Sequence, residues 1–293
     1  MINIFKLGYV EFGAKDMEGM KSYYSDTMGF TLTDQDSNGS VYFSSSTDHH
    51  NIVLNPSNES GIRCFGLQYQ SDLPINEVAE YLNFKFGIIS ELKTNSKPGV
   101  YELLEFTDPE GYVVQLYPHM ALKNPGFKKE GIIPNKLGHL SLRVNDPKKQ
   151  VEFYTQLGFF NTDWIEDFFG FMTCNRDHHV LNFCASEKKG THHIAFEMRN
   201  YSHLVEKLDF LRSKNTKIEW GPSRHGAGHN VACYHYDTEG NMIELFTDAD
   251  IFVKELGMFE PRPWHKDYPQ KPKVWNAEEC LSVWGVDFEK ALV

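Results

Sequence analysis

The sequence predicts an α+β protein built from two similar halves, and three observations support this fold class. Each half opens with an apolar strand and a helical segment that ends in Gly-Phe. Each half closes with a glycine-containing turn that leads into another apolar strand. The spacing also agrees, since Tyr9 and Gln115 are 106 positions apart, and His139 and Glu244 are 105 positions apart. A duplication is the simplest explanation of these matches.

The first half contains two units of the same type. A strand is expected over residues 7–12, followed by a helix over residues 17–28. A second strand over residues 62–69 precedes a helix near residues 74–82, and the closing turn and strand cover residues 108–117. Each unit therefore consists of a strand, a helix and several further strands.

The second half repeats this order. A strand over residues 137–144 precedes a helix over residues 147–157. The strand at residues 191–198, with the sequence THHIAFEM, precedes a helix over residues 201–213. The closing turn and strand occupy residues 237–246. The whole chain thus uses the strand–helix–strands unit four times.

Linker signals divide the chain between the halves. Residues 123–131 are rich in glycine, proline and lysine. We therefore expect an N-terminal domain over residues 1–130 and a C-terminal domain over residues 131–293. Beyond about residue 250 the sequence becomes proline-rich without clear periodicity, which predicts an extended tail lying on the C-terminal domain, because its tryptophans are poorly suited to free solution.

Composition restricts the class of partner. With 293 residues and 41% hydrophobic content the chain can fill sizeable cores, and no stretch has the length and apolarity of a signal peptide or membrane span. A cytoplasmic protein with reduced, mostly buried cysteines is expected. The formal net charge of −11 argues against nucleic acid and membrane as partners and favours a small molecule.

Potential metal ligands occur at three matched places of the second half and at none of the first. The matched positions are His139 with Tyr9, Glu244 with Gln115, and the pair His192-His193 with Cys64-Phe65 or a near neighbour. Two imidazoles and one carboxylate form the facial triad of non-haem Fe(II) enzymes, which leaves coordination positions open for substrate and dioxygen. The sequence therefore predicts a metal site in the second half alone.

Strand alternation separates the two adjacent histidines. Ser141 and Arg143 share the polar face of His139. The equivalent face of the THHIAFEM strand holds His193, whereas His192 shares the opposite face with apolar side chains. We therefore predict that His193 is the ligand and that His192 faces the packing side.

The simpler alternative is that these are structural residues. A single histidine on a strand is usually a hydrogen-bonded structural side chain. An unpaired Glu244 carboxylate between Ile243 and Leu245 would cost several kcal/mol to bury, and the coincidence of three positions favours a metal site. His225 lies in a glycine-rich stretch before the last hairpin and is an acid/base candidate.

These residues resemble the type I extradiol ring-cleavage dioxygenases, the catechol 2,3-dioxygenase group of the vicinal oxygen chelate superfamily. The segments that carry the resemblance are residues 221–246, with the sequence GPSRHGAGHNVACYHYDTEGNMIELF, together with His139, residues 175–178, His192-His193 and residues 261–265 (PRPWH). The resemblance spans nearly the whole chain.

The resemblance implies specific roles for these residues. His139, His193 and Glu244 would bind Fe(II), or occasionally Mn(II). His178 would be the acid/base residue beside the metal, and His225 and Tyr234 would hydrogen-bond the substrate oxygens. The family spacing favours His178 over His179 for this role, but strand alternation does not decide between these two neighbours.

The resemblance also implies a fold and a reaction. Each domain would consist of paired βαβββ modules forming a partly open barrel, with metal in the C-terminal domain only. The expected reaction is extradiol cleavage of a catechol-type aromatic diol by dioxygen, giving a muconic semialdehyde-type product. A homo-oligomer, either dimer or tetramer, is expected, and the identity of the diol stays open.

Two other functions fit the same scaffold. One is a metal-dependent isomerase or glutathione transferase of the glyoxalase type, which needs the metal ligands but has no use for His178, His225 and Tyr234. The other is a metal-free small-molecule binding protein of the bleomycin-resistance type, which does not need a carboxylate at Glu244. The occurrence of all six positions together favours the dioxygenase.

Overall fold

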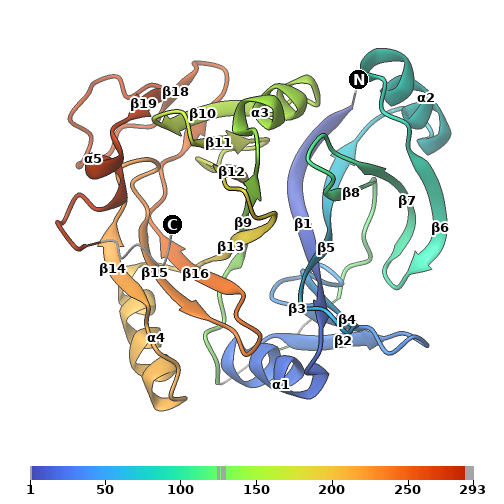
Figure 1. Cartoon of the computed structure of the whole chain (residues 1–293), viewed down its shortest axis with the longest axis horizontal. Helices are drawn as coiled ribbons and strands as arrows, with labels where there is room; N and C mark the ends of the chain where they lie inside the picture. Colours follow the sequence, from blue (N-terminus) through green and yellow to red (C-terminus); the bar gives the residue numbers. More distant parts are fainter. Residues whose placement is uncertain (1, 124–125, 127–129, 288–293) are drawn as a thin grey trace. The chain divides into compact units, whose positions relative to one another are not determined.

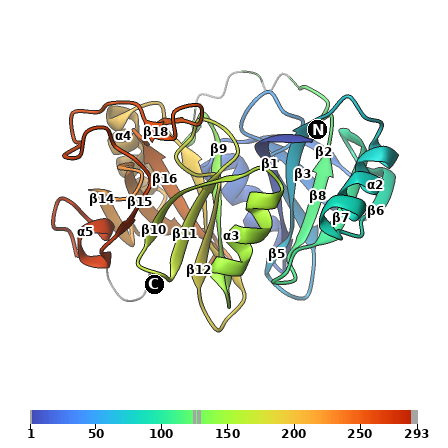
Figure 2. The same cartoon turned by 90° about the horizontal axis from the view of Figure 1, so that it is seen from above.

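The computed structural model of the protein describes residues 2–123, 126 and 130–287. The chain forms two compact units, Met1–Ile133 with Glu152–Gly158, and Pro134–Val151 with Phe159–Val293. One large curled sheet of eight strands belongs to the first half, and one of nine strands belongs to the second (Figures 1 and 2). The predicted α+β class and its repeated modules are confirmed. The division into independent domains at residue 130 stays a prediction.

The first sheet contains two βαβββ modules. The first module consists of β1 (Asn3–Ala14), α1 (Met17–Ser22), β2 (Thr31–Gln35), β3 (Val41–Ser44) and β4 (Ile52–Pro56). A single π-helical turn (η1, Tyr23–Thr27) extends α1, so the predicted helix over residues 17–28 has two parts. The second module consists of β5 (Gly61–Gln70), α2 (Ile75–Phe86), β6 (Glu91–Lys97), β7 (Val100–Thr107) and β8 (Val113–Tyr117).

The second sheet repeats both modules. They consist of β9 (Lys136–Val144), α3 (Pro147–Gln156), β10 (Phe160–Ile165), β11 (Phe169–Thr173) and β12 (Leu181–Ala185), then β13 (Gly190–Glu197), α4 (Tyr201–Ser213), β14 (Trp220–Arg224), β15 (Val231–Tyr236) and β16 (Met242–Thr247). The tail adds β17 (Phe252–Val253), β18 (Met258–Phe259), β19 (Lys273–Trp275) and α5 (Ala277–Leu281).

Strand order is equivalent in the two sheets. The first runs β2-β3-β4-β1-β5-β8-β7-β6, and the second runs β10-β11-β12-β9-β13-β16-β15-β14, with β19 added beyond β10. In both, the first strands of the two modules pair antiparallel at the centre, and each pairs parallel with the last strand of a module. The central strands therefore bring residues from both modules of one half together on one curved face.

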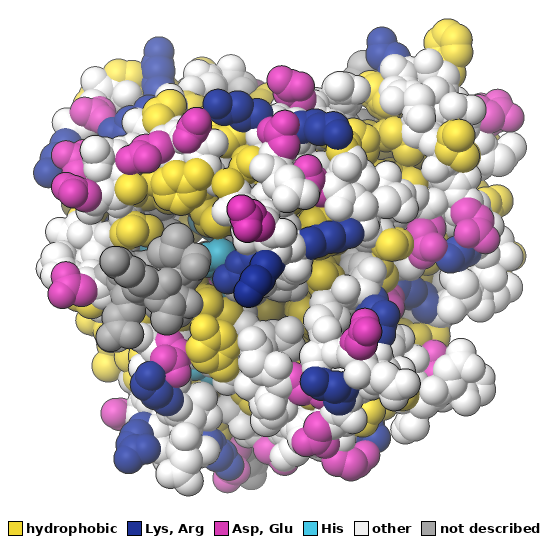
Figure 3. All heavy atoms as spheres, in the orientation of Figure 1, with side chains coloured by type: hydrophobic (Ala, Val, Ile, Leu, Met, Phe, Trp, Pro, Cys, Tyr) yellow, Lys and Arg dark blue, Asp and Glu magenta, His cyan; other side chains and the backbone are white. Residues whose placement is uncertain are grey.

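The surface and core agree with the composition. All five cysteines are buried and none forms a disulfide, as expected for reduced thiols. Among the described residues, no helix is long and apolar enough to cross a membrane. On the face seen in Figure 3, acidic and basic side chains are interspersed.

Candidate metal centre

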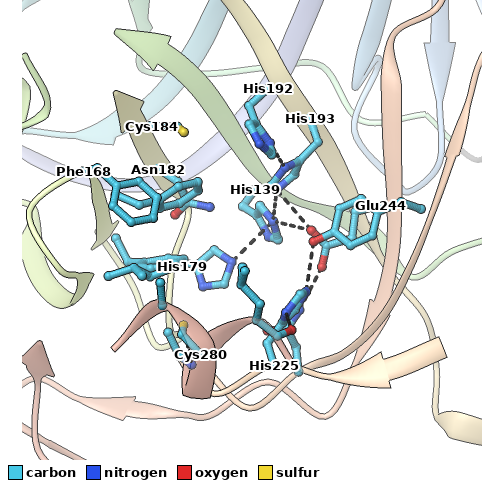
Figure 4. Close-up of a pocket in the computed structure, with 18 residues that line it drawn as sticks. His139, Phe168, His179, Asn182, Cys184, His192, His193, His225, Glu244 and Cys280 are labelled. Carbon is cyan, nitrogen blue, oxygen red and sulfur yellow. Dashed lines mark hydrogen bonds and ion pairs between the residues drawn. The ribbon is translucent and has the colours of Figure 1, made fainter. Parts of the chain in front are cut away.

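Three adjacent strands of the second sheet carry the three predicted ligands. His139 lies on β9, His193 on β13 and Glu244 on β16. Ala195 of β13 pairs with His139 on one side and with Glu244 on the other, and His193 precedes it by two residues on the same strand. The three side chains consequently converge on the concave face, where all three are buried (Figure 4).

The three potential ligand atoms form a nearly equilateral triangle. His139 Nε2 lies 3.0 Å from His193 Nε2 and 3.1 Å from Glu244 Oε2, and His193 Nε2 lies 3.1 Å from Glu244 Oε2. Three ligands on one face of an octahedral metal, each at about 2.1 Å from it, are about 3 Å apart. The donor types and their spacing therefore fit one metal ion with open positions opposite the protein.

The expected charges suit metal binding. Burial raises the pKa of the Glu244 carboxyl, but His139 and His193 outweigh burial and hold this pKa well below its ordinary value. Burial lowers the pKa of His139, against the opposing effect of Glu244. A carboxylate and neutral imidazoles are the forms in which these side chains coordinate a divalent cation.

Two neighbours that the sequence did not identify orient the ligands. Asn230 Nδ2 donates a hydrogen bond of 2.8 Å to Glu244 Oε1, which leaves Oε2 directed at the triangle. His192 Nδ1 lies 2.7 Å from His193 Nδ1, so His193 presents its Nε2 to the site. Such outer contacts fix ligand orientation in metal proteins.

The prediction that His192 faces the packing side is therefore wrong. The side chain borders the same cavity as His193 and contacts its ring. The cause is a register shift between Thr191 and His193 in the pairing of β13 with β9, because a bulge breaks the strict alternation of side chains along a strand.

His225 and Tyr234 form a second polar group at the site. His225 Nε2 lies 3.0 Å from Tyr234 Oη, and its Nδ1 lies 2.8 Å from the carbonyl oxygen of Leu281. A carbonyl only accepts, so Nδ1 of His225 donates and Nε2 accepts the hydroxyl proton of Tyr234. Burial lowers the pKa of His225, and burial followed by the Glu244 charge raises that of Tyr234. The two residues are thus a neutral imidazole and a protonated phenol.

The structure corrects the assignment of His178. Its ring points away from the metal ligands, with Nε2 3.0 Å from Asp163 Oδ2 and one face stacked on Phe259. His179 is the neighbour that borders the cavity, and its Nε2 lies 3.3 Å from His139 Nε2. Strand alternation cannot predict which of the two histidines faces the cavity, because both lie in the bend between β11 and β12 rather than on a strand.

A cavity of about 240 Å³ lies in front of the triad. Figure 4 shows Phe168, from the β10–β11 turn, across the cavity from Glu244. Tyr234, Ile165 and Phe169 also line the cavity. Helix α5 of the tail adds Cys280 and Leu281 to the wall. The tail contribution was not predicted, because a five-residue helix leaves no periodic signal in the sequence.

Comparison with known proteins assigns the family. The sequence model of the Glyoxalase/Bleomycin resistance protein/Dioxygenase superfamily matches residues 6–116 and 136–245. The chain therefore belongs to this superfamily, and the two matches coincide with the two predicted halves.

The relatives within the superfamily are extradiol dioxygenases. Metapyrocatechase of Pseudomonas sp. (strain CF600) is 22% identical over 94% of this chain and 92% of its own length. The 1,2-dihydroxynaphthalene dioxygenase of Pseudomonas sp. (strain C18) is 23% identical over 74% of this chain and 76% of its own length. These relatives confirm the predicted resemblance.

Solved structures share the fold. Homoprotocatechuate 2,3-dioxygenase from Arthrobacter globiformis is 20% identical and has a TM-score of 0.82, covering 99% of this chain and 90% of its own. The Mn(II)-bound glyoxalase from Novosphingobium aromaticivorans is 22% identical, with a TM-score of 0.84 and coverages of 100% and 95%. At these identities the likeness establishes the arrangement of the paired modules.

Proposed function

We propose that this protein is an extradiol dioxygenase, which opens the ring of a catechol-type aromatic diol with dioxygen. The observation that carries the proposal is the grouping of the His139–His193–Glu244 triangle with His179, His225 and Tyr234 around one cavity. A site that only coordinated a metal would not need three further proton-carrying side chains next to it. The full-length relatives named metapyrocatechase support the same function.

Fe(II) is the metal we propose for the triad, with Mn(II) as the alternative. A metal ion held by His139, His193 and Glu244 would keep further coordination positions for the diol oxygens and for dioxygen. The chemistry supplied by the metal when bound is Lewis-acid ionisation of the diol and electron transfer between the ring and dioxygen. Both oxygen atoms enter the product, a muconic semialdehyde-type compound, as the carbon–carbon bond next to the diol breaks.

We assign the acid/base role to His179. Its Nε2 lies at the cavity, next to the triad, and burial lowers its pKa well below the ordinary value, so the free imidazole can accept a proton from a diol hydroxyl. The same nitrogen can return this proton to oxygen later in the reaction. His178, for which the sequence predicted this role, has no access to the cavity.

Tyr234 and His225 hold the diol at the other side. The Tyr234 hydroxyl keeps its proton because its pKa is raised, and it can turn from His225 Nε2 to a substrate oxygen. His225 keeps a fixed tautomer through the Leu281 carbonyl. A bound diol would therefore meet the Tyr234 hydroxyl as a donor and the His225 Nε2 lone pair as an acceptor.

Anaerobic loading tests the proposal. The purified protein is loaded with Fe(II) under argon, catechol and its alkyl derivatives are added, and oxygen uptake is recorded with the visible spectrum after air is admitted. We expect oxygen consumption together with a yellow product. Absence of both for diols of several sizes, in protein that retains one Fe(II) per chain, would contradict the proposal.

A glyoxalase-type isomerase is the rival on the same scaffold. Such an enzyme would consume the hemithioacetal of glutathione and methylglyoxal without oxygen, and it would survive replacement of His179. We expect His179→Gln to lose oxygen uptake while it retains the metal. Isomerase activity in the oxygen-free protein would favour the rival.

Two further expectations concern the state of the protein. We propose that it is a cytoplasmic homo-oligomer, either dimer or tetramer. Light scattering after size-exclusion chromatography measures the mass of the assembly, and a mass near 33.8 kDa, that of one chain, would contradict the oligomer.

A further inference from the structure

A chain of three polar side chains leads away from the cavity through His179. His179 Nδ1 lies 2.8 Å from His178 Nδ1, and His178 Nε2 lies 3.0 Å from Asp163 Oδ2. All three side chains are buried, with Asp163 only 1% exposed. The proposed acid/base residue is therefore the outer end of a hydrogen-bonded row that begins at a buried carboxylate.

The direction of each hydrogen bond follows from the carboxylate. Both oxygens of Asp163 already accept hydrogen bonds, from the Lys273 N–H and from Trp275 Nε1–H, so the proton of the contact with His178 belongs to His178 Nε2. With a single ring proton, on Nε2, His178 accepts at Nδ1, and His179 then carries its own proton on Nδ1. The Nε2 of His179 is left with its lone pair directed at the cavity, which is the form that a base needs there.

The tail of the chain holds Asp163 in place. The backbone N–H of Lys273 donates 2.8 Å to Asp163 Oδ1, and Trp275 Nε1 donates 2.8 Å to Asp163 Oδ2. Both donors belong to β19, which pairs with β10 in parallel register beside Asp163. The carboxylate therefore accepts from β19 and from His178 at the same time.

The first half contains the same three residue types without these supports. Asp34, His49 and His50 each stand 129 positions before Asp163, His178 and His179. His49 and His50 are 3.0 Å apart at Nδ1, but His49 Nε2 is 3.5 Å from Asp34 Oδ2, and the Asp34 side chain is 41% exposed. Strand β2, which carries Asp34, is the edge of its sheet. The row is tight only in the half that contains the predicted metal ligands.

We infer that Asp163 and His178 are positioning residues that fix the tautomer and direction of His179. The inference rests on the proposed function for its effect on turnover, but the tautomer itself can be measured separately. His178 acts through the proton that it accepts from His179 Nδ1, and Asp163 acts through the proton that it accepts from His178 Nε2. Without His178, the tautomer of His179 with its proton on Nε2 becomes available, and this form cannot accept a proton from the diol.

Three variants isolate this effect. His178→Phe keeps a ring that can stack on Phe259 but removes the acceptor for His179. His178→Asn restores an acceptor near the position of Nδ1. His49→Phe makes the matched change in the first half and is the control for packing. The two hydrogen bonds from β19 to Asp163 do not involve the side chain at residue 178, so we expect these variants to keep them.

The first readout is the tautomer. In protein loaded with diamagnetic Zn(II), the ring ¹⁵N resonances of His179 are assigned by their loss in His179→Gln. We expect a protonated Nδ1 in the wild type and in His49→Phe, and a shift toward protonated Nε2 in His178→Phe. An unchanged tautomer in His178→Phe would overturn the inference.

The second readout is turnover of two diols by the Fe(II)-loaded protein. We expect His178→Phe to lower kcat/KM for catechol by about 10- to 100-fold, the usual effect of residues that orient an active group. The loss should be smaller for 4-nitrocatechol, whose hydroxyl ionises more readily, and His178→Asn should recover part of the activity. Equal losses for both diols would mean that His178 only packs, and this would also overturn the inference.

The two proposals fail in different ways. A wild-type protein that never consumes oxygen, but whose His179 tautomer changes in His178→Phe, contradicts the proposed function and leaves the positioning role intact. A wild-type protein that cleaves catechol, with the same tautomer and activity in His178→Phe and His49→Phe, contradicts the positioning role alone.

Discussion

The two halves of the molecule place different side chains at the same strand positions. In the second half, Ala195 lies between His139 and Glu244, and in the first half Gly66 lies between Tyr9 and Gln115. The position matching His193 is Cys64, because each pairs with the residue two places beyond Tyr9 or His139. The fold therefore retained the geometry of the site in both copies, although the ligands occur in only one.

A lysine takes the centre of the first site. Lys97 Nζ donates to Tyr9 Oη at 3.0 Å and to Gln115 Oε1 at 2.6 Å, and it also pairs with Glu11. Burial alone would lower the pKa of Lys97, but Glu11 raises it overall, so the ammonium stays charged. In the first half this position therefore holds a cation supplied by a side chain, and in our proposal the matching position of the second half holds a metal ion.

The largest expected effect comes from making the second site resemble the first. Glu244→Gln introduces the residue found at the matching position and removes the only charged ligand of the triad. We expect loss of bound metal and a fall in activity on the order of 1000-fold or more, since metal ions contribute several kcal/mol to catalysis. Metal analysis and oxygen uptake measure both effects, with Gln115→Glu in the first half as the control. Retention of metal and activity would show that the triad is wrong.

Replacing Lys97 in the first half should lower the free energy of unfolding without changing the dioxygenase activity. Lys97→Met leaves the Glu11 carboxylate largely buried without its main partner, and we expect a loss of roughly 3 kcal/mol in the free energy of unfolding. Urea unfolding of the metal-loaded protein measures this loss. The double variant Lys97→Met with Glu11→Gln should recover part of it. A fall in kcat without a fall in stability would contradict a purely structural role.

A third difference between the halves predicts a response to acid. His235 of β15 is fully buried and its pKa is lowered by burial to about 3, whereas the matching position of β7 is Phe106. Below about pH 6.5, His235 binds a proton in the unfolded chain but not in the folded protein. The free energy of unfolding therefore falls as the pH drops below about 6.5. From pH 7 to pH 5 this group alone should cost about 2 kcal/mol.

His235→Phe should remove this part of the pH dependence. The measurement is the free energy of unfolding of the wild type and variant at both pH values, because the difference between them isolates the histidine. An identical loss in the two proteins would mean that His235 is not protonated on unfolding in this range.

Much of the site could be predicted because duplication supplies its own control. The ligands stand out as positions where His139, His193 and Glu244 replace Tyr9, Cys64 and Gln115, and polar and apolar residue types alternate in the sequence from His139 to Val144. The same repeat contains a further signal, because the pairs His49-His50 and His178-His179 are 129 positions apart. Asp34 and Asp163 are 129 positions apart as well, and this third match indicates Asp163 as the partner of His178.

What could not be predicted depends on local departures from regular structure. The bulge at His193 turned His192 toward the cavity, and the bend before β12 determined which of His178 and His179 faces the site. Neither departure has a periodic signature. The tail is equally hard to predict, because helix α5, which lines the cavity, has five residues, and β19, which pairs with β10, has three.

The pairing of β19 with β10 has one more consequence, for the solubility of the protein. An unpaired strand at the edge of a sheet exposes backbone groups to which a strand of another molecule can add. β19 covers that edge of the second sheet, whereas the edge strand β6 of the first carries Glu91, Lys93 and Lys97, the kind of charged sequence that discourages such addition. β19 is then the edge strand itself, and its length of only three residues limits the backbone that is open to such addition.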